Sequence, residues 1–230
     1  MRGLTERILR AMSGGPADPA RQRARMVTAH LRSRGIADER VLDAMATVPR
    51  ERFIDERRRA IAYADEALPI ESGQTISQPY VVARMTELLG TRPGDRILEI
   101  GTGSGYQAAV LAAMGCRVTS IERHADLADS ARERLAAWPP ADSVEVRVGD
   151  GTLGAPDGAP WDGIIVTAAG PSVPPSLRDQ LADGARLVIP VGPRDRQQLL
   201  VVTRHGNEWT ETSDGAVVFV PLIGEEGFEG

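Results

Sequence analysis

A glycine-rich turn constrains this chain more than any other feature of its sequence. Segment 96–100 is apolar and β-branched enough to form a buried strand, and good helix formers follow over 108–113. Between them stand Gly101, Gly103 and Gly105. Only glycine lets a backbone bend this sharply and still leaves room for a ligand against the main chain. The following helix would offer free N–H groups at its N-terminus, so the segment predicts a ligand-binding strand–turn–helix unit.

The spacing of these glycines discriminates between ligands. Dinucleotide sites carry Gly-x-Gly-x-x-Gly, which is shaped for a pyrophosphate, whereas this chain carries Gly-x-Gly-x-Gly. The second pattern is more typical of S-adenosylmethionine sites, where no phosphate has to be held. Glu99, just before the turn, is placed to bind the ammonium of a methionine moiety, directly or through water. A tight turn that binds no ligand remains the alternative at this point.

Two further strand ends place acidic side chains beside this turn. Segment 117–122 is predicted as the next strand and ends in Glu122, about 20 residues after Gly101, where an acid can accept hydrogen bonds from both ribose hydroxyls. The strand predicted over 144–148 leads to Asp150, which is placed to accept from an adenine amino group. Each acid taken singly is as readily a cap or a solvated loop residue. Together, at the carboxyl edge of a parallel sheet, they predict a nucleoside-type ligand.

Composition limits the class of protein. The chain has 230 residues, a formal net charge of −5 and a pI near 5.3, which suits one domain with a full core. All 27 basic residues are arginine, but the acidic balance argues against nonspecific nucleic-acid binding. One cysteine, Cys116, excludes an internal disulfide, and the three histidines lack metal-ligand spacing. With no membrane-length apolar run and no evident signal peptide, we expect a cytoplasmic monomer.

The segment before the glycine turn is predicted to be mainly helical. We expect a loosely ordered arm over 1–20 and then a helical N-terminal layer over 21–94, with a helix at 51–63. An ordered loop over 67–80 interrupts this layer. In that loop, Ser77 is a good N-cap for the following helix, with Pro79 tolerated in its first turn.

From residue 95 to 224 the pattern alternates between strands and helices. The alternation predicts an α/β domain with a doubly wound, mostly parallel sheet. The apolar run at 161–167 suits a strand covered on both faces, and a short helix is expected over 177–181. Two later strands, over 198–204 and 208–213, are predicted to form a hairpin. No internal repeat is present, so 1–230 is predicted as a single domain.

These motifs resemble those of the protein-L-isoaspartate (D-aspartate) O-methyltransferase family, over roughly residues 21–224. The loop at 73–80 and the Phe-Val-Pro-Leu run at 219–222 match, and within them segments 74–80 and 220–222 are the most specific to the family. The other matching segments are 67–70, 98–107, 149–151, 164–169 and 187–192. Two departures concern peptide preference rather than the reaction. Val218 stands where family members often have arginine, and Glu71-Ser72 replaces a more usual Gly-Tyr or Gly-Gln pair.

The resemblance implies a class I, Rossmann-like methyltransferase fold, with S-adenosyl-L-methionine as donor, S-adenosyl-L-homocysteine as product and no metal. It implies methylation of the free carboxylate of L-isoaspartyl, and some D-aspartyl, residues in damaged proteins, which starts repair through a succinimide. Isoaspartyl proteins and peptides are the implied partners, without nucleic acid or membrane. The implied donor-binding residues are Thr75, Ile76, Glu99, Gly101, Thr102, Gly103, Gly105, Glu122, Asp150 and Gly151. The implied catalytic residue is Ser77, and the implied substrate-binding residues are Thr75, Ile76, Ser77, Val220, Pro221 and Leu222.

This chemistry needs no general base. A carboxylate with a pKa near 3.9 is already ionised at neutral pH and can attack a sulfonium methyl directly. Catalysis is then mainly alignment of the reacting atoms with water excluded. A neutral hydroxyl at Ser77 can orient the carboxylate, whereas a cation there would hold the ground-state anion too tightly.

Three alternatives follow from the same residues. A carboxyl methyltransferase for a specialised peptide or small acid would use the same fold and donor. An NAD-linked oxidoreductase would need the Gly-x-Gly-x-x-Gly spacing and a proton donor, and neither is evident in this chain. A binding module without catalysis would use the same crevice, but the intact loop at 74–79 argues against it.

Overall fold

A computed structural model describes residues 18–230 of the chain. Residues 1–17 of the predicted arm lie outside the described residues. Of the rest, Asp18 is the N-cap of α2 (Pro19–Met26), so the arm is already helical from Pro19. This helix continues as η1 (Val27–Leu31) and η2 (Arg32–Arg34), and α3 (Glu39–Thr47) follows. Asp38 caps α3, since its carboxylate accepts from the backbone N–H of Arg40 at 2.9 Å, as the sequence predicted.

The central sheet contains seven strands in the order β5-β4-β3-β6-β7-β8-β9. The strands are β3 (Arg96–Ile100), β4 (Arg117–Glu122), β5 (Val144–Val148), β6 (Trp161–Val166), β7 (Leu181–Val191), β8 (Gln197–His205) and β9 (Glu208–Val217). The first five in spatial order are parallel, and β8 and β9 add to them as an antiparallel hairpin. The predicted doubly wound, mostly parallel sheet is therefore confirmed.

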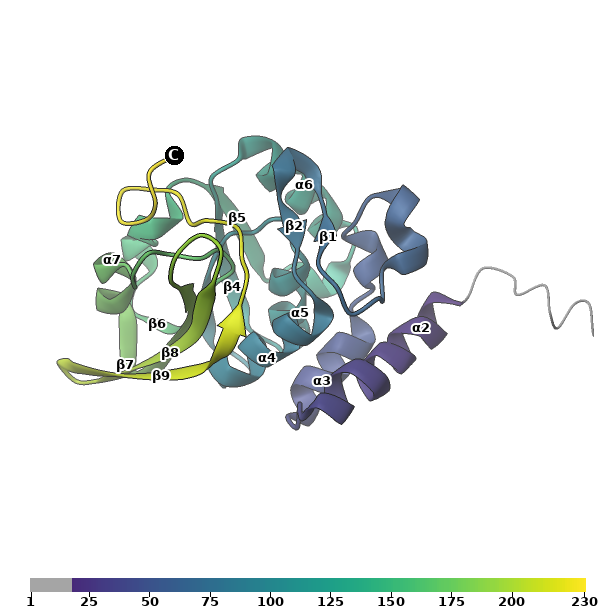
Figure 1. The fold of residues 1–230 in the computed structure, drawn as a ribbon, viewed down its shortest axis with the longest axis horizontal. Helices are drawn as coiled ribbons and strands as arrows, with labels where there is room; N and C mark the ends of the chain where they lie inside the picture. The colour runs from purple at the N-terminus through teal and green to yellow at the C-terminus, as the bar shows by residue number, and fades with distance from the viewer. Residues whose placement is uncertain (1–17) are drawn as a thin grey trace, which may run out of the picture.

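Helices cover both faces of this sheet, which explains the near-continuous apolar strands. One face packs against α4 (Pro79–Leu89), α5 (Tyr106–Ala113), α6 (Ala125–Ala136) and the N-terminal layer. The other face packs against α7 (Pro175–Asp179) and the loops around it. Successive residues of β3 alternate between them: Ile97 belongs to the first core, and Leu98 and Ile100 belong to the second. In Figure 1, α2 and α3 lie at one end of the molecule and the β8–β9 hairpin at the other.

The order of the strands brings distant segments to one edge. The carboxyl ends of β3, β4, β5 and β6 share this edge because these strands are parallel. Since β8 and β9 are antiparallel to each other and β8 runs against β7, β8 starts and β9 ends at the same edge. Residues just before Gln197 and just after Val217 therefore lie at the same edge of the sheet as the glycine turn, although they are about 100 residues away in the sequence.

The ordered loop predicted at 67–80 contains a small hairpin. Two short strands, β1 (Leu68–Pro69) and β2 (Thr75–Ile76), pair antiparallel, and η5 (Glu71–Gly73) forms the tip. This tip is fixed to α6 through a hydrogen bond from Ser72 to Asp126 and an ion pair between Arg134 and Glu71. The two residues that depart from the family pattern, Glu71 and Ser72, are therefore those that hold the hairpin to α6.

Three local predictions were wrong. Ser77 does not cap α4: the helix begins at Pro79, the N-cap residue is Gln78, and no side chain caps it. Proline at the first helical position sets this boundary, because it favours an extended conformation in the residue before it. The helix expected over 51–63 is instead two 3₁₀ turns, η3 (Arg50–Arg52) and η4 (Glu56–Ile61).

The third wrong prediction concerns the helix expected over 177–181. It begins at Pro175 and ends at Asp179, and the following strand β7 already starts at Leu181. The remaining short turns are η6 (Pro139–Ala141), η7 (Gly151–Leu153) and η8 (Pro156–Gly158). Within residues 18–230, no helix is long and apolar enough to cross a membrane.

Candidate functional site

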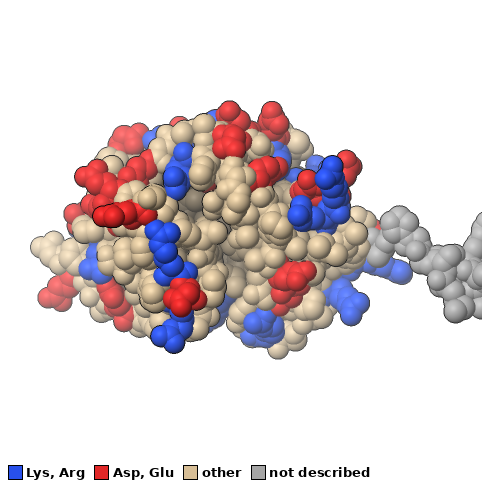
Figure 2. Space-filling model, turned by 45° about the horizontal axis from the view of Figure 1, so that its top comes forward, with Lys and Arg blue, Asp and Glu red and all other residues tan. Residues whose placement is uncertain are grey.

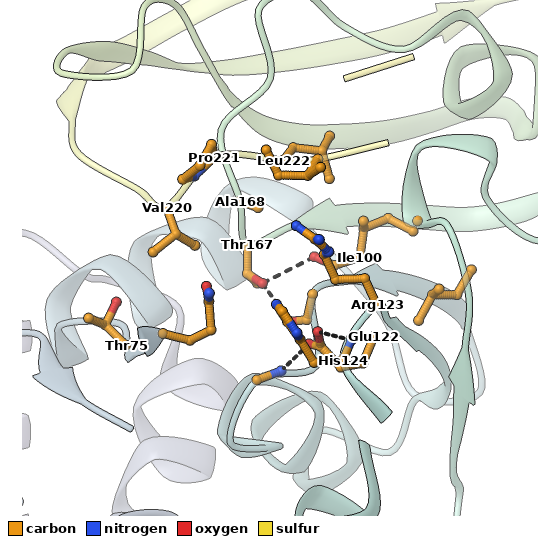
Figure 3. Close-up of a pocket in the computed structure, with 16 residues that line it drawn as sticks. Thr75, Ile100, Glu122, Arg123, His124, Thr167, Ala168, Val220, Pro221 and Leu222 are labelled. Atoms are coloured by element: carbon orange, nitrogen blue, oxygen red, sulfur yellow. Dashed lines mark hydrogen bonds between the residues drawn. The ribbon is translucent and has the colours of Figure 1, made fainter. Parts of the chain in front are cut away.

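The glycine turn after β3 opens onto a cavity at the carboxyl edge of the sheet, here called the donor cavity (Figure 3). Its walls come from the ends of β3, β4 and β6, from the β1–β2 hairpin and from the segment after β9. The residues that line it are Gln74, Thr75, Ile100, Gly101, Gly103, Ile121, Glu122, Arg123, His124, Gly151, Thr167, Ala168, Val220, Pro221, Leu222 and Ile223. Eight of the predicted site residues are among them, drawn from five separate segments of the chain.

Glu122 is the acidic side chain of this cavity. One carboxylate oxygen accepts from the backbone N–H of Gly103 at 2.9 Å, and the other accepts from that of His124 at 3.1 Å. These bonds fix the carboxylate against the glycine turn, as Figure 3 shows, while each oxygen keeps a lone pair for a ligand. The arrangement suits a pair of adjacent hydroxyl groups, and the predicted bonds from ribose hydroxyls to Glu122 stay a prediction.

Glycine is required where the turn meets β6. Gly101 has φ +91°, and a Cβ there would stand 2.5 Å from the hydroxyl oxygen of Thr167. That hydroxyl oxygen lies 2.6 Å from the carbonyl oxygen of Gly101 and 3.1 Å from that of Ile100. Gly151 is packed as closely, because its Cβ would stand 2.4 Å from a methyl carbon of Ile100. The cavity floor is therefore made by backbone in close contact with neighbouring strands.

Glu99 lies beneath the turn and does not line the cavity. It is fully buried, and one of its carboxylate oxygens accepts from the hydroxyl of Ser120, which in turn bonds Thr102. The other oxygen, Oε1, has no hydrogen-bond partner among the described residues. Burial raises the pKa of Glu99 to about 8. The predicted bond to a donor ammonium stays a prediction, and the unpartnered oxygen is what such a bond would satisfy.

Asp150 is engaged by its own chain. Its Oδ1 accepts from the backbone N–H of Thr152 at 2.9 Å, and its Oδ2 accepts from that of Glu225 at 2.8 Å. Burial acts to raise the pKa of Asp150, but these hydrogen bonds hold it below its ordinary value. The neighbouring Gly151, rather than the Asp150 side chain, lines the cavity. Its predicted bond to an adenine stays a prediction.

Three other predicted donor residues support the site from behind. Thr102 and Ile76 are buried, and neither lines the donor cavity. Gly105 is the N-cap of α5 with φ +87°, and a Cβ there would press on Leu135 of α6. These positions shape the turn and the hairpin rather than the cavity wall.

A second cavity of about 380 Å³, here called the acceptor cavity, adjoins the first. It is lined by Ala67, Thr75, Ser77, Gln78, Val81, Thr167, Arg196, Ala216, Val217, Val218 and Phe219. Thr75 and Thr167 line both cavities, so the two meet at these residues. Ser77 lines only the acceptor cavity, whereas Val220, Pro221 and Leu222 line only the donor cavity. The predicted substrate-binding run at 220–222 therefore borders the other cavity in this structure.

A buried arginine fixes the backbone at Ser77. Arg50 is fully buried, and its guanidinium donates to the carbonyl oxygens of Ser77 at 2.8 Å, Ala62 at 2.7 Å and Glu66 at 3.3 Å. Burial lowers the pKa of Arg50 to about 10, so it stays charged at neutral pH. A cation here thus binds the main chain of the loop and leaves the Ser77 side chain beside the acceptor cavity.

Among the lining residues that sequence reasoning missed, four are of chemical interest. Arg123 and His124 directly follow β4, and Thr167 directly follows β6, so the rule that identified Glu122 would also have found them. Arg196 precedes β8 and could be placed only once the hairpin register was known. Among residues 18–230, no group of three or more His, Cys, Asp and Glu side chains is arranged to hold a metal ion.

The chain matches a family model over residues 21–227, described as protein-L-isoaspartate(D-aspartate) O-methyltransferase. A relative from Methylorubrum populi, named protein-L-isoaspartate O-methyltransferase, is 56% identical over 209 residues, which is 90% of this chain and 98% of the relative. A relative of the same name from Methanoculleus marisnigri is 53% identical over 215 residues, which is 93% of this chain and 97% of the relative.

Solved structures agree with these sequence matches. A structure named protein-L-isoaspartate O-methyltransferase superposes with a TM-score of 0.81 at 27% identity, covering 89% of this chain and 67% of that chain. A Plasmodium falciparum protein described as this type of methyltransferase, in complex with S-adenosyl-L-homocysteine, gives 0.75 at 27% identity, covering 87% and 98%. The likeness confirms the predicted class I methyltransferase fold.

Proposed function

The chain belongs to the protein-L-isoaspartate(D-aspartate) O-methyltransferase family, and on this premise we propose that it methylates the free carboxylate of L-isoaspartyl, and some D-aspartyl, residues in damaged proteins. The methyl ester carries a better leaving group than the free acid, because its methoxy group departs as methanol. The neighbouring backbone nitrogen can therefore close to a succinimide without the enzyme, and hydrolysis returns part of the material to normal aspartate. The observation that carries the proposal is that two cavities, one built on the glycine turn, meet at Thr75 and Thr167.

The residues of the donor cavity fit S-adenosylmethionine. The Glu122 carboxylate suits the two ribose hydroxyls, and the apolar side chains of Ile121 and Leu222 suit a purine. The buried, unpartnered Oε1 of Glu99 suits an ammonium, directly or through water. When bound, this donor supplies a methyl group on a sulfonium, which passes to a carboxylate oxygen and leaves S-adenosylhomocysteine.

The acceptor cavity can position a carboxylate without a base. The acceptor is already an anion at neutral pH, so no residue has to remove a proton. The Ser77 hydroxyl can donate one hydrogen bond to it, and Arg50 holds the Ser77 backbone in place. The hairpin and the segment after β9 cover the junction and would exclude water, which favours alignment of the reacting atoms.

We further propose that the enzyme works in the cytoplasm and as a monomer. The monomer is proposed because residues of one chain line both cavities. The described part of the molecule carries arginines and acidic residues interspersed over the face shown in Figure 2, rather than one broad basic stripe. Light scattering would give a mass near 24.7 kDa for a monomer. A mass of twice that value would reject the monomer and leave the reaction unaffected.

The test of the reaction is methyl transfer from labelled S-adenosylmethionine to two short peptides that differ only in L-isoaspartate against normal aspartate. We expect a base-labile label on the isoaspartyl peptide alone. Label on neither peptide, with donor binding intact by calorimetry, would reject the isoaspartyl acceptor. It would then favour a specialised peptide or small acid as the acceptor of the same fold.

A further inference from the structure

Arg196 is the one charged side chain among the described residues that line the acceptor cavity. No hydrogen bond or ion pair joins its guanidinium to any residue of the described chain. Arg194, two positions earlier, contrasts with it: it donates to the carbonyl oxygen of Glu229 at 2.8 Å and lies 5.0 Å from the ring centre of Phe228. Arg196 therefore presents an exposed and unneutralised cation to an otherwise uncharged cavity.

The backbone on either side of Arg196 is held in place. Gln197 is buried, and its side-chain amide donates to the carbonyl oxygen of Pro193 at 2.6 Å and accepts from the backbone N–H of Phe219 at 2.9 Å. Gln197 also pairs with Val217 across the β8–β9 ladder, so Arg196 and Val218 are the next residues along the two strands. The cation thus projects from a fixed point beside the exposed side chain of Val218.

The position of Arg196 separates it from the reacting group. The methyl acceptor must face the donor cavity, and the two cavities meet at Thr75 and Thr167. Ser77 and Arg196 both line the acceptor cavity only, but Ser77 comes two residues after the shared Thr75, whereas Arg196 comes from the wall formed by β8 and β9. A cation on the reacting carboxylate would also stabilise the ground state and slow transfer. The ligand that suits Arg196 is therefore a different anionic group of the acceptor.

We propose that Arg196 gives this enzyme a preference for acceptors that carry a second carboxylate close to the isoaspartyl residue. That carboxylate can be an acidic side chain or the free end of a peptide chain, since both offer the same planar anion to a guanidinium. The inference rests on the proposed function and specifies its substrate class. It makes Arg196 a specificity-determining residue and gives it no part in methyl transfer itself.

The test compares kcat/KM for matched isoaspartyl peptides at low ionic strength. The first peptide has an acidic residue next to the isoaspartate and an amidated C-terminus, and the second has a neutral residue there and a free C-terminal carboxylate. The third has a neutral residue and an amidated C-terminus, and the fourth has a lysine next to the isoaspartate. We expect the wild-type enzyme to favour one of the two anionic peptides over the neutral one by about two- to five-fold, as for an exposed ion pair. Whichever of the two is favoured identifies the source of the carboxylate, and salt should reduce the preference.

Variants of Arg196 assign this preference to one side chain. Arg196→Ala should reduce the ratio of anionic to neutral peptide to about one, and Arg196→Glu should reverse it in favour of the lysine peptide. Arg196→Lys should retain part of it. The expected change lies in KM rather than kcat, because the reacting group is not touched. A kcat loss that is equal for all peptides would overturn the proposal in favour of a structural role.

Arg117→Ala is the matched control. It removes the same charge at the start of β4, at the opposite edge of the sheet from the cavities. We expect it to leave the peptide ratio unchanged, and an equal fall of the ratio would attribute the effect to net charge. If the wild-type enzyme methylates all four isoaspartyl peptides equally well, the role proposed for Arg196 is rejected and the proposed function is not. An enzyme that methylates no isoaspartyl peptide would instead reject the proposed function and, with it, this inference.

Discussion

The donor cavity and the acceptor cavity are built in different ways. The donor cavity lies where neighbouring parallel strands end, and its acidic group, Glu122, is fixed by hydrogen bonds from the backbone N–H groups of Gly103 in the glycine turn and of His124. The acceptor cavity is assembled from the β1–β2 hairpin, Thr167 and the β8–β9 hairpin, which are far apart in the sequence. One is a property of a local motif, and the other is a property of the whole topology.

The difference suits two different ligands. The donor is the same molecule in every turnover, so a rigid, close-packed cavity does not limit which substrates the enzyme can use. The acceptor varies from one damaged protein to another, so its cavity is lined mainly by small or apolar side chains with a single cation, Arg196. We expect substitutions on the donor side to affect affinity for one molecule and those on the acceptor side to affect turnover or choice of peptide.

The largest effect is expected from Gly101→Ala. The residue has φ +91°, and the new Cβ would stand 2.5 Å from the Thr167 hydroxyl oxygen, so the turn and the cavity floor must move. We expect the Kd for the donor to rise about 100-fold, which is about 2.7 kcal/mol. Calorimetric titration of the folded variant measures it.

Gly184→Ala is the control for backbone strain in this experiment. Gly184 has φ +76°, but a Cβ there would meet nothing within 4 Å. It should lower stability by about 1–2 kcal/mol and leave the donor Kd unchanged. If both variants bind the donor as the wild type does, close packing at Gly101 is not what shapes the cavity.

Ser77→Ala tests the acceptor side. The variant loses the one hydroxyl proposed to orient the acceptor carboxylate, and hydrogen bonds to charged groups contribute about 1.5–3 kcal/mol. We expect kcat to fall about 30-fold while the donor Kd is unchanged, since Ser77 does not line the donor cavity. Steady-state kinetics and donor titration on the same preparation separate the two. An unchanged kcat would remove Ser77 from the mechanism.

This contrast also explains how far the sequence could be interpreted. The glycine turn, Glu122 and the sheet were predicted because their signals are local: glycines that need positive φ, and acids that follow apolar strands. The N-cap assigned to Ser77 was wrong because Pro79 sets the helix start one residue later than Ser77 could cap. Arg196 was missed because its place depends on the pairing of Gln197 with Val217.

The N-terminal layer shows the same limit. Segment 51–63 has helical composition, but Arg50 donates to the carbonyl of Ala62 and thereby holds both ends of the segment in one compact turn. The structure there is two 3₁₀ turns, and the buried guanidinium of Arg50, which needs carbonyl partners, bonds the carbonyl oxygen of Ala62 that follows the second turn. No pattern within the segment itself could show that requirement.

Glu99→Gln tests the buried carboxyl group beneath the donor cavity. Burial raises the pKa of Glu99 from 4.5 to about 8, so the folded protein favours its neutral form. Its contribution to stability is therefore fully present below pH 4.5 and is lost as the pH rises toward 8. We expect the free energy of unfolding of the wild type to fall over this window, and that part of the fall to disappear in Glu99→Gln.

The same variant tests whether Glu99 binds the donor. An ammonium near Oε1 would favour the carboxylate, so donor binding should release a proton below pH 8 and tighten as the pH rises. We expect Glu99→Gln to weaken the donor about ten-fold and to abolish the proton release. Calorimetric titration in two buffers of different ionisation enthalpy measures both. Proton release that persists in the variant would assign it to another group.

The smallest effect is expected at the hairpin that both cavities share. Gln74 and Thr75 line the donor cavity, Thr75 also lines the acceptor cavity, and the hairpin tip is held to α6 by the bond from Ser72 to Asp126. This bond is exposed, and the ion pair between Arg134 and Glu71 remains when it is lost. Ser72→Ala should therefore speed donor release only about two- to three-fold, measured by stopped-flow displacement.

Ser72→Gly separates the bond from the backbone conformation. Ser72 has φ +54°, which alanine tolerates poorly and glycine tolerates well. Both variants lose the bond to Asp126 and should release the donor at the same faster rate, while only Ser72→Ala keeps the backbone strain and is the less stable of the two. Faster release in Ser72→Ala alone would mean that strain at the hairpin tip, rather than its attachment to α6, controls access to the donor cavity. The conformation of the β1–β2 hairpin would then affect both cavities, because Thr75 lines both. The donor cavity would in that case be less rigid on its hairpin side than on its glycine-turn side.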